Sequence, residues 1–415
     1  MNFESEYRMP AEWSPHAATW IAWPHNPGDW PNKFQPIPWV YCEIVRHLSQ
    51  VEDVHILVND EGSERRATNM LRRQGSNVAR LHFHCWRTDR VWLRDSGPIF
   101  VKNGEGEVAL TNWKFNAWAK YDNWRNDALI PKQVAKLHGM TSFEPSVTMA
   151  DGKARRLVLE GGSIDTNGEG VLLTTEECLL SDIQQRNPGV SREQLEQAFA
   201  QYLGIEKVIW LNRGCAGDDT HGHVDDISRF VGVNTILTAV EHNTADENHL
   251  PLAENLERLH AARNLKKKPF TIKTLPMPAP VVFEGQRLPA SYANFYIANN
   301  LVLVPTFNDP NDRIALNTLG GVFPGSHGDG DSLHGLYLGP RRSALHDAAG
   351  ARMIAVPEAK PWPPPPDMES IRELVRAADP EGHLAEGAHK EKKTLSPEHL
   401  KQVAAPAQVA PGPAK

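Results

Sequence analysis

The chain has 415 residues, a formal net charge of −7 and no long basic run, which argues against nucleic acid or anionic membranes as partners and favours a cationic small molecule. No apolar run approaches the roughly 20 residues of a membrane helix, and the acidic start Met1–Glu6 lacks the layout of a secretory signal, so we expect a cytoplasmic protein. Four cysteines lack Cys-x-x-Cys spacing and indicate neither a disulfide framework nor a zinc knuckle: Cys42, Cys85, Cys178 and Cys215.

The first quarter of the chain predicts alternating strands and helices. A segment rich in tryptophan and proline, residues 9–25, indicates a short strand between irregular loops. Apolar residues at helical spacing predict a helix over 39–51, followed by a buried strand over 54–58 and a second helix over 64–74.

Two polar turns then interrupt predicted strands. Residues 87–101 predict a strand, a Gly-Pro turn and a second strand, and Asp95 is charged where a strand would favour an apolar residue. A surface salt bridge is the alternative explanation for that charge. A similar hairpin is predicted over 157–165, where Glu160 precedes a Gly-Gly turn that would let the backbone approach a ligand.

The remaining elements repeat this pattern. The predicted elements are a helix from Ser191 to about Tyr202, strands over 208–211, 227–231 and 235–240, a helix over 253–266, and a hairpin over 291–305. The unit of strand, polar turn, strand, helix and strand recurs at roughly 60 to 70 residues, which favours radial repetition around a central site.

The stretch Gly217–Asp226 is the densest group of titratable residues. If it forms a strand, His221, His223 and Asp225 share one face. We weigh three interpretations: a site for a flat cation in which His223 moves protons, a structural acidic loop, and a metal site similar to the His-x-His-x-Asp-His run of binuclear zinc hydrolases. The last of these lacks the final histidine ligand.

The sequence changes character after Pro324. Residues 353–415 hold eleven of the 32 prolines and a single aromatic residue, Trp362, so we expect a disordered tail with at most one short helix capped at Ser370. The predicted domains are 1–324, a replaced segment over 325–352, and the tail over 353–415.

Five motifs resemble the agmatine deiminases of the guanidine-modifying superfamily, over Met9 to about Pro324. They are residues 9–13 (MPAEW), 92–98 (WLRDSGP), 159–164 (LEGGSI), 217–225 (GDDTHGHVD) and 304–310 (VPTFNDP). The resemblance implies an α/β fold, a five-fold pseudosymmetric propeller whose last repeat is incomplete here. It also implies hydrolysis of agmatine to N-carbamoylputrescine and ammonia, a step toward putrescine, without a metal or organic cofactor.

The resemblance also implies residue roles. Asp95 and Asp225 would clamp the guanidinium, Glu160 would add a further acidic contact, and His223 would protonate the departing ammonia and then activate water. The predicted substrate-binding residues are Trp92, Asp218 and Asp219.

The family's nucleophile has no counterpart in this sequence. In the family it is the cysteine of a Gly-Gly-Gly-x-x-His-Cys-x-Thr-Gln-Gln type motif shortly after the Phe-Pro, whereas the last cysteine here is Cys215. Back-translation of residues 335–350 with a one-base shift is compatible with Asp-Phe-Ile-Trp-Gly-Leu-Gly-Ala-Leu-His-Cys-Met-Thr-Gln-Gln, the Cys codon lying across Leu345 and His346. We therefore favour a reading-frame slip near Gly325.

Alternatives stay open at this point. Cys215 could substitute as nucleophile, although a buried structural thiol is the favoured role. The chain could instead be a non-catalytic guanidinium- or polyamine-binding protein, or a metallohydrolase. The sequence leaves open agmatine against peptidyl-arginine as substrate, and whether the protein is a homo-oligomer.

Overall fold

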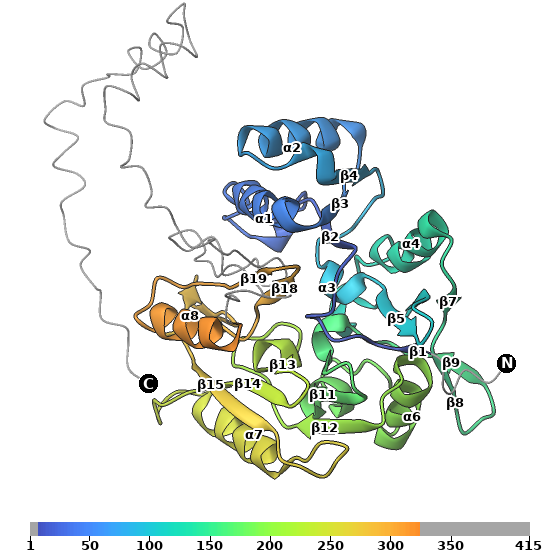
Figure 1. The fold of residues 1–415 in the computed structure, drawn as a ribbon, viewed down its shortest axis with the longest axis vertical. Coiled ribbons are helices and arrows are strands. Elements are labelled where there is room, and N and C mark those ends of the chain that lie inside the picture. Colours follow the sequence, from blue (N-terminus) through green and yellow to red (C-terminus); the bar gives the residue numbers. More distant parts are fainter. Residues whose placement is uncertain (1–6, 324–415) are drawn as a thin grey trace, which may run out of the picture. The chain divides into compact units, whose positions relative to one another are not determined.

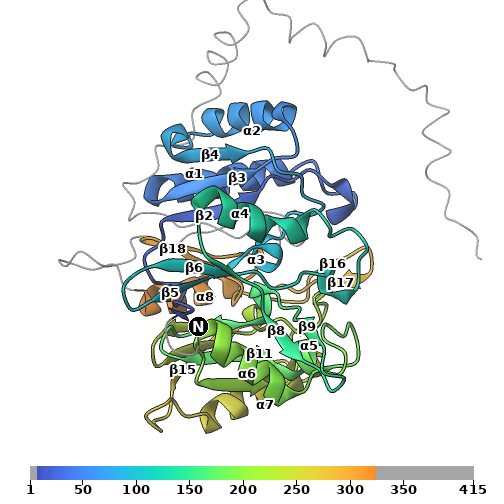
Figure 2. The ribbon, with the colours of Figure 1, turned by 90° about the vertical axis from the view of Figure 1, so that its right-hand side faces the viewer.

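The computed structural model describes residues 7–323, and the predictions for 324–415, including the proposed reading-frame slip and the tail, lie outside the described residues. Three parallel strands form the first sheet, in the order β2 (Ala18–Ala22), β3 (Asp53–Leu57) and β4 (Leu81–His84). They are joined by α1 (Ile37–Val51) and α2 (Glu61–Arg73), which lie beside the strands in Figures 1 and 2.

The predicted helical spacing explains α1. Val40, Ile44, Val45 and Leu48 are each at most 4% exposed, and they pack in one apolar cluster with buried side chains of β2 and β3. Helix α2 is capped by Asp60, whose carboxylate accepts a hydrogen bond from the Ser63 amide at 2.7 Å. The predicted strand over 54–58 and the two predicted helices are confirmed to within three residues at each boundary, and β2 is the short strand expected within residues 9–25, whereas β4 was not predicted.

The rest of the described chain is built from copies of one recurring unit. Each copy begins with an antiparallel hairpin and continues through a helix to a strand that pairs in parallel with the hairpin. Its first copy is β5 (Ile99–Asn103), β6 (Val108–Thr111), α4 (Ile130–His138) and β7 (Ser142–Phe143), with β1 (Tyr7–Arg8) added at the edge of β5. Its second copy is β10 (Asp165–Thr166), β11 (Val171–Thr175), α5 (Glu176–Leu180), α6 (Arg192–Leu203) and β12 (Lys207–Leu211).

The third copy is β13 (Ser228–Gly232), β14 (Thr235–Val240), α7 (His249–Ala261) and β15 (Thr271–Pro276). The hairpin of β18 (Tyr296–Ala298) and β19 (Leu301–Leu303), followed by α8 (Asn311–Val322), begins a fourth. Two small hairpins stand apart, β8 (Ser146–Thr148) with β9 (Ala154–Arg156), and β16 (Val282–Phe283) with β17 (Gln286–Arg287).

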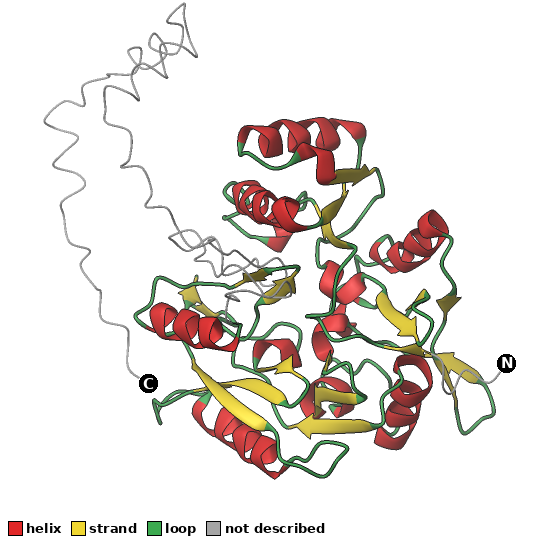
Figure 3. Cartoon of the chain, viewed as in Figure 1, coloured by secondary structure: helices red, strands yellow, loops and turns green. Residues whose placement is uncertain are grey.

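These copies bear out the predicted mixed α/β unit and its spacing of roughly 60 to 70 residues. Figure 3 shows helices and strands mixed throughout the described part of the chain. Helix α6 has the capping box formed by Ser191 and Gln194. The helix predicted over 253–266 instead begins at His249 and ends at Ala261, because Ala262 is extended and Arg263 pairs with Pro269. Among the described residues, no helix is long and apolar enough to cross a membrane.

Candidate active site

Asp95 lies on the one-turn helix α3 (Leu93–Ser96), so the strand predicted across this segment is wrong. The turn forms because Ser96 and Gly97 donate their amides to the carbonyls of Trp92 and Leu93. The buried Asp95 carboxylate accepts hydrogen bonds from the Gly162 amide and from the Trp118 indole, both at 3.1 Å. Burial, together with the charges of Asp225 and Glu160, raises the pKa of Asp95 to about 6.

The Gly-Gly turn after Glu160 brings backbone close to this carboxylate, as its sequence indicated. A Cβ atom on Gly162 would lie 2.5 Å from Nδ1 of His223 and 2.7 Å from Oδ1 of Asp95, so only glycine fits there. The turn is a single 3₁₀ turn over Gly161–Ser163. It therefore fixes the spacing between Asp95 and His223.

Glu160 is held by an arginine that sequence analysis did not identify. Arg186 Nε lies 3.2 Å from Glu160 Oε1, and both side chains are fully buried. Arg186 also donates to the carbonyls of Gln184, at 3.0 Å, and Thr220. Burial alone would raise the pKa of Glu160, but the charges of Arg186 and His223 outweigh it, and the pKa lies below its usual value.

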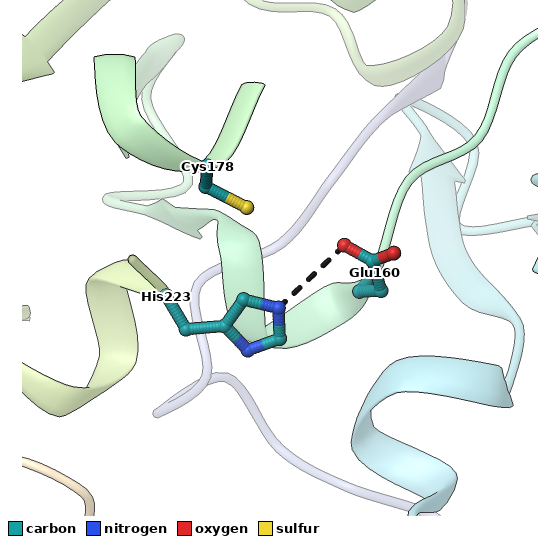
Figure 4. Close-up of side chains that lie close together, drawn as sticks. All are labelled: Glu160, Cys178 and His223. Carbon is teal, nitrogen blue, oxygen red and sulfur yellow. Dashed lines mark ion pairs between the residues drawn. The ribbon is translucent and has the colours of Figure 1, made fainter. Parts of the chain in front are cut away.

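His223 lies between two carboxylates. Its Nε2 is 3.5 Å from Oε2 of Glu160, and its Nδ1 is 3.9 Å from Oδ1 of Asp95. Figure 4 shows the imidazole edge turned toward Glu160, with Cys178 on the same side. Burial opposes a charged imidazole, but the charge of Asp95 above all, and the adjacent Cys178 and Glu160, raise the pKa of His223 well above its usual value.

The strand considered for Gly217–Asp226 does not form. Gly217, His221 and Gly222 have φ values of 86°, 62° and 94°, and Val224–Asp226 form a 3₁₀ turn that begins at His223. His221 consequently turns away and approaches Ser181 Oγ at 3.2 Å through Nε2. Among the described residues, His221 and Asp225 do not join His223 in a group of potential metal ligands, which removes the geometric basis of the zinc-hydrolase interpretation.

Asp225 is buried beside Arg94, whose Nε lies 3.7 Å from its Oδ2. Arg94 also pairs with Glu12 at 2.6 Å, and Glu12 pairs with Arg229 at the same distance. Glu12 belongs to the MPAEW motif, so this motif connects the N-terminal segment to the site. Sequence analysis assigned no role to Glu12.

Asp218 and Asp219 have different surroundings. Asp218 organises the loop, since its carboxylate accepts the amides of Thr220, Gly222 and His223 at 2.7 to 3.0 Å. Asp219 is partly exposed and pairs with Lys120 and the Tyr121 hydroxyl. Both residues line the cavity.

A cavity of about 1280 Å³ brings most of the predicted residues together. Its lining includes Trp92, Asp95, Asp218, Asp219, His223 and Asp225, whereas Glu160 lies behind His223 and does not line it. No cysteine within residues 7–323 lines the cavity. The arrangement can hold a planar cation against Asp95 and Asp225 and exchange a proton with it through His223.

Trp118 is a site residue that the sequence did not reveal. It lines the cavity and donates to Asp95, and it lies in a run in which Ala117, Trp118 and Ala119 all have positive φ of 50° to 59°. Left-handed backbone in three successive non-glycine residues costs energy and is found mainly at functional sites. No residue type in the sequence signals it.

Cys178 is a further residue that sequence analysis missed. Its sulfur, a carboxylate oxygen of Glu160 and a ring nitrogen of His223 all lie within 4.8 Å of one another. Cys215, the thiol considered as a substitute nucleophile, packs in the apolar cluster of β11 to β14. Burial raises its pKa well above the usual value, which disfavours a thiolate.

Comparison with known proteins identifies the family. The model of Porphyromonas-type peptidyl-arginine deiminases matches residues 8–327. A Selenomonas ruminantium relative is 38% identical over 77% of this chain and 88% of its own, and an agmatine deiminase of Ectopseudomonas mendocina is 32% identical over 86% and 96%.

Two solved structures share this fold at 30% identity, each covering 77% of this chain and 88% of its own. One is the agmatine deiminase of Enterococcus faecalis catalysing its reaction, with a TM-score of 0.68, and the other a cysteine-to-serine C. jejuni agmatine deiminase with substrate bound, with a TM-score of 0.66. The chain belongs to the peptidyl-arginine deiminase family of which these agmatine deiminases are members.

Proposed function

We propose that the cavity binds the guanidinium of agmatine, and that the site is that of an agmatine deiminase, which hydrolyses agmatine to N-carbamoylputrescine and ammonia. The observation that carries the proposal is the convergence of Asp95, Asp225 and His223, all buried, on one cavity. A buried guanidinium requires carboxylates at its edges, because its N–H groups would otherwise lose their hydrogen bonds with water.

Each side chain then has a role in the proposed reaction. Asp95 and Asp225 accept N–H groups of the guanidinium and hold its central carbon in place. A nucleophile adds to that carbon, and the C–N bond to the departing group breaks as His223 gives it a proton to form ammonia. His223 next takes a proton from water, whose oxygen adds to the carbon and releases the nucleophile.

Glu160 and Arg186 support His223 in this scheme. Because Glu160 contacts Nε2 and Asp95 faces Nδ1, the ring is held edge-on between them. Trp92 and Trp118 give the cavity flat walls, and Asp218 shapes the loop that carries His223. Asp219 lies farther along the cavity wall with Tyr121, where it would meet the rest of the substrate.

The nucleophile is the part that this chain lacks. Cys178 lies behind His223 and outside the cavity lining, so it is not placed to attack a substrate held by Asp95. The family cysteine is instead expected in the shifted reading frame of residues 335–350. We expect a chain of this sequence to bind agmatine without turnover, and a frame-corrected chain to release ammonia.

Calorimetric binding of agmatine, beside ammonia release, tests both statements. Asp95→Asn removes one charge-assisted contact worth about 1.5–3 kcal/mol, so the Kd for agmatine should rise roughly 10- to 100-fold. Asp151→Asn, on an exposed loop, is the matched control and should leave the Kd unchanged. Failure of the unaltered chain to bind agmatine would contradict the proposal, and sequencing the coding DNA between Pro324 and Ala351 tests the frame slip directly.

Five finer statements are also proposals. The recurring hairpin, helix and strand unit supports a five-fold α/β propeller whose last copy is incomplete in this chain. The agmatine deiminase relatives favour agmatine over peptidyl-arginine. A cytoplasmic location, homo-oligomerisation and the domain boundaries at 324 and 352 stay predictions.

A further inference from the structure

Behind the cavity lies a group of buried side chains that only partly serves the proposed reaction. Glu160, Cys178 and His223 come from three separate segments of the chain, and each is at most 3% exposed. The proposed reaction uses His223 and Glu160 but gives no task to the Cys178 thiol. The thiol nevertheless points to the same small space as the other two groups (Figure 4).

Two polar atoms in this space have no hydrogen-bond partner. Oε2 of Glu160 and Nε2 of His223 are both buried, and the contact between them is an ion pair at 3.5 Å that is too long to count as a hydrogen bond. Buried polar atoms nearly always have a hydrogen-bond partner, so two that lack one and face the same point indicate room for a further ligand. A carboxylate oxygen, an imidazole nitrogen and a sulfur are the three kinds of ligand that zinc takes in proteins.

Neighbouring residues hold the three candidate ligands in place, as the residues around a metal site usually do. Arg186 binds Oε1 of Glu160 at 3.2 Å and thereby leaves Oε2 free. Asp95 faces the other ring nitrogen of His223, at 3.9 Å, and a carboxylate on that side is the common second partner of a metal-bound histidine. Thr175 caps the backbone amide of Cys178 at 3.0 Å and fixes the start of α5.

We propose that Glu160, Cys178 and His223 form a site for a zinc-type divalent ion. Binding would release two protons to solvent, the thiol proton of Cys178 and the Nε2 proton of the charged His223 imidazole, and would leave Nδ1–H turned toward Asp95. The ion would not serve the deiminase reaction, because it ties up the imidazole that carries protons. It would act as an inhibitor, and this consequence, unlike the binding itself, rests on the proposed function.

Cobalt(II) is the probe, since a cobalt–thiolate bond gives a charge-transfer absorption band that nitrogen and oxygen ligands do not. The full chain, stripped with chelator and dialysed against Co²⁺ or Zn²⁺, should take up one ion and show the band with Co²⁺. Cys178→Ser should abolish the band and weaken binding at least about tenfold, whereas Cys42→Ser, a buried cysteine on α1 outside the group, should change neither.

Two outcomes would overturn the proposal: no ion retained by the unaltered chain, or equal retention and band in Cys178→Ser, which would mean an adventitious metal only. X-ray absorption of the unaltered zinc-loaded chain, expected to show one sulfur with nitrogen and oxygen neighbours, makes the test independent of the folding of any variant. Agmatine calorimetry separates the two proposals, because a chain that shows the band but binds no agmatine retains the metal site and loses the deiminase function.

Discussion

Replacing Arg186 by methionine removes the buried ion pair between Arg186 and Glu160 and so tests how much that pair stabilises the fold. The substitution leaves a buried carboxylate without its cation, which typically costs 3–5 kcal/mol of the free energy of unfolding. It also leaves the carbonyls of Gln184 and Thr220 without their donor, at about 1 kcal/mol each. We therefore expect Arg186→Met to lower the free energy of unfolding by about 5–7 kcal/mol.

A double-mutant cycle measures how much of this loss comes from the interaction between Arg186 and Glu160. The free energies of unfolding are obtained from urea titrations monitored by tryptophan fluorescence and circular dichroism. Glu160→Gln removes the carboxylate charge, so Arg186→Met should cost at least about 2 kcal/mol less in that background. The surface pair of Arg65 and Glu61 is the control, since Arg65→Met should change stability by no more than about 0.5 kcal/mol. A loss below about 1 kcal/mol for Arg186→Met, or additivity with Glu160→Gln, would refute the reasoning.

Three further predictions concern other parts of the structure. His55 is half-buried, and partial burial together with the nearby His84, His82 and His138 lowers its pKa to about 4, so it is neutral in the folded state at neutral pH. Stability should therefore fall from about pH 6.5 toward pH 4, by about 1–2 kcal/mol after allowance for solvent screening. The decrease should be smaller in His55→Gln, and equal pH slopes of the urea midpoints in the two proteins would contradict this. Gly162→Ala should weaken agmatine binding at least about tenfold in calorimetry by forcing His223 and Asp95 apart, while Gly104→Ala, where the added Cβ meets nothing within 4 Å, should not. Trp118→Phe removes a hydrogen bond worth about 1 kcal/mol from Asp95 and should raise the agmatine Kd about fivefold, whereas Trp113→Phe, which loses a comparable bond to Thr111 away from the cavity, should leave the Kd unchanged.

Local patterns in the sequence predicted the regular elements well. The helical spacing of Val40, Ile44 and Leu48 and the capping box at Ser191 depend on residues within one or two turns, so the sequence alone carries them. The strand predicted through Leu93–Asp95 failed because a single helical turn of four residues leaves no periodicity to detect.

Contacts between distant segments could be predicted only through the resemblance. The motifs led to Asp95, Glu160, His223 and Asp225, three of which line one cavity while the fourth supports His223. The long-range partners of these residues were missed. Arg186 reaches Glu160 from a loop, and nothing in the neighbouring sequence marks it as a buried cation.

The positions of the buried arginines explain which of the site's carboxylates gains most from binding a cationic ligand. Glu160 has Arg186, and Asp225 has Arg94, which it shares with Glu12. Among the described residues, Asp95 has no arginine or lysine within ion-pair distance and depends on neutral donors and on His223. Burial, and then the charges of Asp225 and Glu160, raise the pKa of Asp95, and among the described residues His223 is the one cation beside it that opposes this rise. A planar cation entering the cavity would supply the missing charge, so Asp95 gains more from binding a guanidinium than the two carboxylates that already have an arginine.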